Sequence, residues 1–246
     1  MNKGRIGVSQ PKILIILPTL NEEQTIGKVI DEIPRPVLEQ AGYAVQVLVV
    51  DGNSTDRTRQ IAEQKGASAI VELRKGKGIA VTTALSSVDA DFIFMLDADY
   101  TYPAGYIPDM LKLLTDHHAV IGSRLKGYRE RGAMSRLNLI GNRLLSLLAT
   151  VLYQRKISDI CTGFWGFRGE VVKNLDLRAT AFDLEAELFS QLARKGYSIA
   201  ELPIDYRRRA SPPKLRSLRD GTRIGWALIT RRFRRLSEPG QKRTGT

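Results

Sequence analysis

The sequence predicts an α/β domain built on a mostly parallel sheet flanked by helices. Short apolar runs alternate with segments of helical period, and a polar loop follows three of the apolar runs. The carboxyl ends of parallel strands meet at one edge of a sheet, where ligands bind. We therefore expect Pro18–Glu22, Asp51–Asp56 and Asp97–Thr101 to share that edge. One domain is expected over residues 1–236, followed by a disordered tail over 237–246.

Each expected element has a local reason in the sequence. Runs of Ile, Val, Leu and Phe predict strands at Ile13–Leu17, Val45–Val50, Ala69–Leu73, Phe92–Leu96, from Ala119 onward, and at Ser198–Tyr206. Amphipathic segments bounded by capping residues, Gly or Pro predict helices at Glu22–Ile33, Thr55–Lys65, Ile79–Val88, Pro103–Leu114, Ser135–Tyr153, Leu184–Lys195 and Arg219–Leu236. We expect the apolar side of Ser135–Tyr153 to pack in the core, with contact to a membrane as the alternative. We expect Arg219–Leu236 to form a basic amphipathic helix.

The composition excludes several classes of protein. The 246 residues contain one Cys and two His, which excludes a disulfide framework and a His- or Cys-rich metal site. The first residues contain no apolar segment, so we expect no signal peptide. The apolar stretches are shorter than the roughly 20 residues that a membrane-spanning helix needs.

The net charge of +12 is concentrated at the end of the chain. From Tyr206 onward there are 13 Lys and Arg against two acids, a net of +11, whereas the preceding residues carry a net of +1. Such a segment is either a solvated tail or a contact for an anionic membrane surface, a phosphate-bearing substrate or nucleic acid.

The loop after Phe92–Leu96 begins with two carboxylates, Asp97 and Asp99. Their oxygens suit a hard divalent cation, which typically bridges to substrate phosphates. Arg74–Gly78 adds cations and glycine N–H groups that a diphosphate can bind. The sequence contains neither G-x-x-x-x-G-K-[ST] nor G-x-G-x-x-G, so the usual nucleotide-binding motifs are absent.

Taken in order, P-T-L-N-E, D-G-N-S-T-D, G-K-G and D-A-D resemble the family 2 glycosyltransferases, which have the Rossmann-like GT-A fold. The later D-I-C-T-G-F and F-D-L-E segments resemble the dolichol-phosphate mannose synthases. M-S-R-L-N-L-I-G-N and L-R-D-G are more similar still to archaeal-type dolichyl-phosphate glucose or N-acetylglucosamine synthases. The resemblance spans about Ile13–Arg235 and implies a nucleotide-sugar half over about 12–124 and an acceptor half over about 125–236.

The resemblance also implies the roles of individual residues. The nucleotide-sugar pocket would be lined by Pro18, Thr19, Asn21, Glu22, Asp51, Asn53, Lys77, Asp97, Ala98 and Asp99. Asp97 and Asp99 would bind Mg²⁺ or Mn²⁺. The acceptor phosphate, or the leaving diphosphate, would meet Arg124, Arg136, Arg209 and Lys214. The catalytic set would be Asp97, Asp99, Arg124 and Arg209. The chain departs from the mannose synthases at Gly52, Thr101 and Trp165, and Arg168 stands near the last of these.

These roles imply inverting, metal-dependent transfer of a sugar from a nucleotide-diphospho-sugar, with a UDP-sugar favoured over GDP-mannose, to a polyprenyl or dolichyl phosphate. The phosphate is largely dianionic at neutral pH, because its second pKa is about 6, so no dedicated base is required. The expected location is cytoplasmic, on the inner face of the membrane, held there by arginines near Trp226.

Three alternatives remain open at this stage. The acceptor could be a polysaccharide or small-molecule hydroxyl, with Glu185 or Glu187 as base. A sugar nucleotidyltransferase shares the fold type but has a glycine-rich first loop that this chain lacks. The basic end could bind nucleic acid, but it contains no recognised module, so no nucleic-acid partner is expected.

Overall fold

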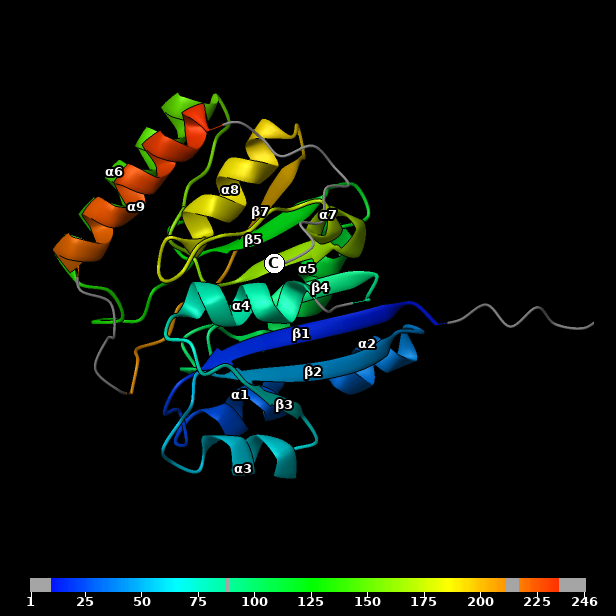
Figure 1. The fold of residues 1–246 in the computed structure, drawn as a ribbon. Helices are drawn as coiled ribbons and strands as arrows, with labels where there is room; N and C mark the ends of the chain where they lie inside the picture. The colour runs from blue at the N-terminus through cyan, green and yellow to red at the C-terminus, as the bar shows by residue number, and fades with distance from the viewer. Residues whose placement is uncertain (1–9, 87–88, 211–216, 235–246) are drawn as a thin grey trace, which may run out of the picture.

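The computed structural model describes residues 10–86, 89–210 and 217–234. At its centre is a seven-stranded sheet with the order β3-β2-β1-β4-β6-β5-β7 (Figure 1). The strands are β1 (Lys12–Thr19), β2 (Ala44–Asp51), β3 (Ser68–Val71), β4 (Phe92–Met95), β5 (Ala119–Ser123), β6 (Trp165–Arg168) and β7 (Ile199–Pro203). The mostly parallel sheet is confirmed: β6 runs antiparallel to β4 and β5, and the other neighbouring strands pair in parallel.

Helices cover both faces of the sheet, because alternate residues of a strand point to opposite sides. On β1, Ile13, Ile15 and Leu17 join one core cluster, while Leu14 and Ile16 join the other. The first cluster lies under α1 (Ile26–Glu32), α2 (Arg35–Gln40), α3 (Thr58–Gln64), the 3₁₀ turn η1 (Ala104–Tyr106) and α5 (Ile107–Leu113). The second lies under α4 (Lys77–Ser86), α6 (Arg136–Tyr153), α7 (Gly169–Lys173), α8 (Leu184–Arg194) and α9 (Ser217–Phe233).

Strand β6 and helices α2 and α7 were not predicted from the sequence. Pro34 and Pro36 end the expected first helix, but Pro36 also fits the first turn of α2, where its missing N–H costs nothing. Strand β6 has only four residues, and its Gly166 is required by its neighbours. A Cβ there would lie 2.7 Å from Phe94 and 2.8 Å from Val120, so the side chains of β4 and β5 meet across it.

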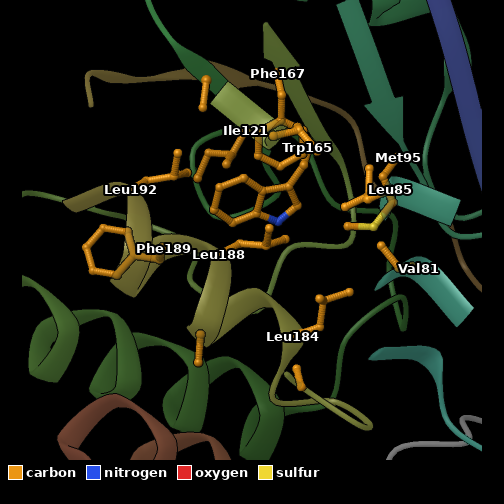
Figure 2. Packing of buried hydrophobic residues seen from close by; sticks show 14 of the residues in the cluster. Val81, Leu85, Met95, Ile121, Trp165, Phe167, Leu184, Leu188, Phe189 and Leu192 are labelled. Carbon is orange, nitrogen blue, oxygen red and sulfur yellow. The ribbon is translucent and has the colours of Figure 1, made fainter. Parts of the chain in front are cut away.

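Trp165 is a core residue of β6 (Figure 2). Its ring stacks on Phe167 with centroids 5.7 Å apart, and its Nε1 donates to the carbonyl of Thr162 at 2.9 Å. Arg168 pairs with Phe92 at the far end of β4 and donates to the carbonyl of Leu114. Neither side chain therefore replaces the phosphate-binding arginine that the resemblance places at Trp165.

The prediction that the apolar side of α6 packs in the core is wrong except at Leu148, which packs partly against the core as Leu145 and Leu152 do. Its buried residues are Asn142, Ser146, Ala149 and Tyr153. The exposed side carries Leu137, Ile140, Leu144, Leu147 and Val151, which are 53–67% exposed. The physical reason is hydrogen bonding. Asn142 donates to Asp159, Ser146 accepts from the N–H of Ile160 at 3.0 Å, and Tyr153 donates to the carbonyl of Leu228 at 2.8 Å.

Helix α9 packs beside α6 and α8 (Figure 1) and is tied to α8 by buried charges. Arg231 lies 3.0 Å from both Glu187 and Asp183, and its side chain is 13% exposed. Glu187 also accepts the backbone N–H groups of Arg178 and Ala179. Arg231 therefore stabilises the helix pair and is not presented to a membrane. Arg235 and the expected tail lie outside the described residues.

We expect Arg231→Met to destabilise the fold, because Glu187 and Asp183 would remain buried without their cation. The expected loss is about 3 kcal/mol of unfolding free energy, measured by urea denaturation. Arg219→Met, an exposed change on the same helix, is the control and should cost little. Equal stability of the two variants would contradict a structural role for Arg231.

Candidate active site

The three polar loops lie together at the carboxyl ends of β1, β2 and β4, as the sequence predicts. The N–H of Asn21 donates to Ser54 Oγ at 2.8 Å, and the N–H of Thr55 donates to Asn21 Oδ1 at 2.9 Å. Thr25 Oγ1 donates to the carbonyl of Ala98 at 2.8 Å, which joins the first loop to the third. Each loop turns on one residue with positive φ: Asn21 (51°), Asn53 (67°) and Tyr100 (64°).

A cleft of about 1390 Å³ runs from these loops to α6 and α9. Its polar end is lined by the predicted residues Pro18, Thr19, Glu22, Asn53, Lys77, Asp97, Ala98, Asp99, Arg124 and Arg209. Its other end is lined by Leu137, Leu144, Leu145, Leu218 and Ile224. One cavity therefore joins a strongly charged end to an apolar end.

Asp97 and Asp99 stand at the polar end in different surroundings. The side chain of Asp97 is 30% exposed, and that of Asp99 is 9% exposed. Asp99 Oδ1 accepts the hydroxyl of Thr101 at 2.6 Å and its N–H at 3.1 Å. Burial and the nearby Asp97 raise the pKa of Asp99, against the opposing effects of Thr101 and Arg209. The two carboxylates thus differ in access to a ligand.

Gly163, from the D-I-C-T-G-F segment, makes room for Asp97. A Cβ at this position would lie 2.3 Å from Asp97 Oδ2. The N–H of Gly163 donates to the hydroxyl of Tyr102 at 2.7 Å, which fixes the backbone against the carboxylate. The position of Asp97 therefore depends on a glycine far away in the sequence.

Arg209 connects the first and third loops. One guanidinium nitrogen lies 2.9 Å from Glu22 Oε1, and the other lies 3.2 Å from Asp99 Oδ2. The Arg209 side chain is 21% exposed and also lines the cleft. It holds two buried carboxylates at the edge of the sheet and leaves part of its surface toward the cavity.

Lys77 bridges two carboxylates from different halves of the chain. Its Nζ lies 2.6 Å from Asp97 Oδ1 and 2.7 Å from Glu185 Oε1. Burial alone would lower the pKa of Lys77, but the two carboxylates outweigh it and raise that pKa above its usual value. Burial raises the pKa of Glu185, and Lys77 opposes this rise. The ammonium therefore stays charged in the cleft wall.

The glycines on either side of Lys77 set its position. A Cβ on Gly76 would lie 1.8 Å from the carbonyl oxygen of Thr180, and one on Gly78 would lie 2.6 Å from that of Ala179. Gly76 also has φ of +130°, a conformation that other residues rarely adopt. The G-K-G segment can therefore pack in direct contact with the backbone that precedes α8, the helix that carries Glu185.

Arg124 is held at the cleft by a buried carboxylate. Its Nε and Nη2 donate to Asp159 at 2.8 and 2.6 Å, and its backbone N–H donates to the same group at 2.9 Å. Its guanidinium lies 5.8 Å from the ring centre of Tyr102 and 5.1 Å from that of Tyr206, within cation–π range. Asp159 orients Arg124, and the aromatic rings shield the pair from water.

Other predicted site residues lie away from the cleft lining. The carboxylate of Asp51 is fully buried and accepts from Ser54, so it shapes its loop from beneath. The side chain of Asn21 binds Thr55, and Arg136 is exposed on the first turn of α6. Lys214 lies outside the described residues. Glu187 is committed to Arg231 and backbone N–H groups, so it is unsuited to act as a base, whereas Glu185 lines the cleft.

The sequence prediction assigned no role to several residues that build the site. Asp159 binds Arg124 and is itself bound by Asn142. Tyr102 accepts from Gly163, and Tyr206, just beyond the carboxyl end of β7, covers Arg124. Asp159 and Gly163 belong to a segment that carried the family resemblance, but no rule of spacing predicts contacts between loops so far apart. These contacts arise from the sheet order.

The polar end of the cleft suits a hard divalent cation brought in with a diphosphate. Among the described residues, no cluster of three or more His, Cys, Asp or Glu side chains could hold a metal by itself. Asp97 and Asp99 supply carboxylate oxygens, and Mg²⁺ commonly takes its other ligands from water and substrate phosphates. The residues present therefore fit a metal that is shared with a ligand.

Comparisons with known proteins agree with the resemblance found in the sequence. Residues 14–176 match the family model described as "Glycosyl transferase family 2". The chain is 36% identical over 218 residues to a dolichyl-phosphate hexose transferase of Haloferax volcanii, which covers 88% of this chain and 92% of the relative. It is also 36% identical over 223 residues to glycosyltransferase AglJ of the same organism, covering 89% and 71%.

Among solved structures, the chain resembles glucosyl-3-phosphoglycerate synthase from Mycobacterium tuberculosis, in a complex with Mn²⁺, uridine-diphosphate and glucosyl-3-phosphoglycerate. The TM-score is 0.69 at 25% identity, and the match covers 91% of this chain and 80% of that one. The expected fold is therefore confirmed by comparison as well as by the sheet.

We expect Gly163→Ala to lower turnover of a sugar donor about a hundredfold, because the added methyl group displaces the carboxylate of Asp97. The thermal midpoint of unfolding should stay close to that of wild type, so the loss of turnover would not come from unfolding. Gly105→Ala is the control, since nothing lies within 4 Å of a Cβ at that position. Wild-type turnover in Gly163→Ala would mean that Asp97 is not held where the chemistry needs it.

Proposed function

The chain belongs to glycosyl transferase family 2 and is a glycosyltransferase, and from that premise we propose that it transfers a hexose from a nucleotide-diphospho-sugar to the phosphate of a polyprenyl lipid. The observation that carries the proposal is the single cleft in which Asp97 and Asp99 share a cavity with Arg124 and an apolar wall. The name of the Haloferax volcanii hexose transferase supports the same acceptor class.

The polar end of the cleft would hold the donor. Asp97 and Asp99 would bind Mg²⁺ or Mn²⁺, which neutralises charge that develops on the leaving diphosphate. Asn53 and the backbone around Pro18 and Thr19 would line the nucleotide. We propose a UDP-sugar as donor, which the solved complex of the Mycobacterium tuberculosis synthase with uridine-diphosphate supports.

The middle of the cleft would orient the acceptor phosphate. Arg124 is cationic, fixed by Asp159 and present in the lining, and Arg209 stands on the donor side. A lipid phosphate is largely dianionic near neutral pH, since its second pKa is about 6, so it attacks without losing a proton. Attack on the anomeric carbon opposite the diphosphate inverts that centre.

The apolar end would take the first isoprene units. Leu137, Leu144 and Leu145 of α6 line this end together with Leu218 and Ile224 of α9, and the two helices pack beside each other. A hydrocarbon chain that covers these side chains removes apolar surface from water, at about 25 cal/mol per Å². A small hydrophilic acceptor would leave this wall exposed.

A second acceptor class is favoured by one observation, the place of Glu185 in the cleft wall. A hydroxyl acceptor needs a base, and a buried carboxylate with a raised pKa is suited to that role. Glu185 is nevertheless paired with Lys77, which opposes the rise in its pKa, makes it a weaker base and holds it beside the donor end. We therefore place the hydroxyl acceptor second.

The proposal is tested by assaying transfer from UDP-glucose and UDP-N-acetylglucosamine to a short polyprenyl phosphate in the presence of Mn²⁺. Transfer is expected with one of these donors. Asp99→Asn should lower it at least about a hundredfold, because the leaving diphosphate loses part of its metal site. The control is Asp109→Asn, which removes an exposed carboxylate of α5 that pairs with Lys112.

Two outcomes of this assay would contradict the proposal. Equal transfer to polyprenol, which lacks the phosphate, would show that the acceptor is a hydroxyl and would make Glu185→Gln the decisive variant. Undiminished transfer in excess chelator would remove the metal from the mechanism.

We also propose that the lipid is reached from an anionic membrane surface, with α6 as the contact. No helix in the ranges 10–86, 89–210 and 217–234 is long and apolar enough to cross a membrane. The exposed apolar stripe of α6, Leu137–Ile140–Leu144–Leu147–Val151, includes Leu137 and Leu144, which also line the cleft. The helix contains Arg136 and Arg143 and no acidic residue. Two copies meeting through this stripe would bring like charges together, which favours anionic lipid instead.

Replacing Ile140, Leu147 and Val151 by Asp should release the protein from vesicles that contain phosphatidylglycerol, because charges cannot enter the acyl boundary. Flotation of vesicles measures the bound fraction, and binding of UDP should be unchanged. Val37→Asp, an exposed apolar position on α2, is the control. Retention of the triple variant on anionic vesicles would show that another surface makes the contact. If the wild-type protein were a dimer and the triple variant a monomer, a second copy of the chain would cover the stripe instead.

A further inference from the structure

Both carboxylates of D-A-D are already paired with cations of the chain itself. Lys77 lies on Asp97, and Arg209 lies on Asp99. Asp97 is the more exposed of the two, so Lys77 stands where an incoming metal would meet it. An ammonium 2.6 Å from a carboxylate oxygen and a divalent ion bound to the same oxygen would repel each other strongly.

We propose that the ammonium of Lys77 occupies the metal site while no metal is bound. When the metal binds, the ammonium moves away from Asp97 and pairs with the donor diphosphate. The inference rests on the proposed metal site and adds the order of events: metal and nucleotide enter together, and neither binds well alone. The diphosphate then gives the ammonium a new anionic partner, a role that Lys side chains commonly perform.

The structure gives Lys77 the means to make this exchange. The side chain lines the cleft and lies at the first residue of α4, so its long stem can swing while its backbone stays fixed. The contacts of Gly76 and Gly78 with Thr180 and Ala179 hold that backbone. Glu185 is the second anchor of the ammonium, and it keeps Lys77 next to the donor end after Asp97 is released.

The test measures binding of Mn²⁺ to the full chain by electron paramagnetic resonance, with and without UDP. Lys77→Met removes the ammonium and keeps a side chain of similar length. It should bind Mn²⁺ alone at least tenfold more tightly than wild type and bind UDP with Mn²⁺ more weakly. Lys112→Met is the control, because it removes an exposed lysine that pairs with Asp109 on α5 and does not line the cleft, and its Mn²⁺ affinity should equal that of wild type.

Lys77→Met leaves buried Glu185 without its cation, so the double variant Lys77→Met with Glu185→Gln guards against loss of folding. It should also bind Mn²⁺ alone more tightly than wild type. Any site that shares a metal with a diphosphate shows some cooperativity, and only the comparison with these variants isolates Lys77.

Mn²⁺ affinity in both Lys77 variants equal to or weaker than that of wild type would overturn the inference. The inference would also be overturned if UDP did not increase the affinity of the wild-type protein for Mn²⁺. Absence of Mn²⁺ binding by any variant, even with UDP, would overturn the metal site together with the inference. If the wild-type protein showed no transferase activity while the Mn²⁺ affinities of wild type and variants were as expected, only the proposed reaction would be contradicted.

Discussion

The cleft depends on ion pairs that join distant parts of the chain at the carboxyl edge of the sheet. Lys77 holds Asp97 and Glu185, Arg209 holds Glu22 and Asp99, and Arg124 holds Asp159. Buried carboxylates are costly unless they are paired, so these cations make it possible to gather so many acids around one cavity. The same groups are the natural partners of a diphosphate, a metal and an acceptor phosphate.

The inward face of α6 links this charge arrangement to the surface of the molecule. Asn142 and Ser146 turn inward to bind the segment that carries Asp159, and Asp159 in turn fixes Arg124. Because these polar side chains occupy the inward face, Leu145, Leu148 and Leu152 pack only partly against the core, and the stripe from Leu137 to Val151 faces outward. The exposed stripe and the position of Arg124 thus have a common cause, which places the proposed lipid contact next to the proposed phosphate site.

The sequence predicted the parts of the fold that have a local cause. The apolar runs gave β1, β2 and β4, and the polar loops after them lie on one edge as expected. Strand β6 was missed because Gly166 is explained only by Phe94 and Val120 on neighbouring strands. The burial of α6 was wrongly predicted because hydrophobicity alone favours the leucine side, whereas hydrogen bonds to a loop decide it. Asp51 showed the same limit, since its role beneath the loop depends on Ser54.

A crystal structure with Mn²⁺, UDP and a short polyprenyl phosphate tests the central claim most directly, that one cleft joins a donor site at D-A-D to a lipid-phosphate site at Arg124. The account predicts Mn²⁺ bound to the Asp97 or Asp99 carboxylate and to the diphosphate, with the lipid phosphate in hydrogen-bond reach of Arg124 and the isoprene units against α6 and α9. A diphosphate bound away from Asp97 and Asp99, or a lipid phosphate away from Arg124, would contradict it.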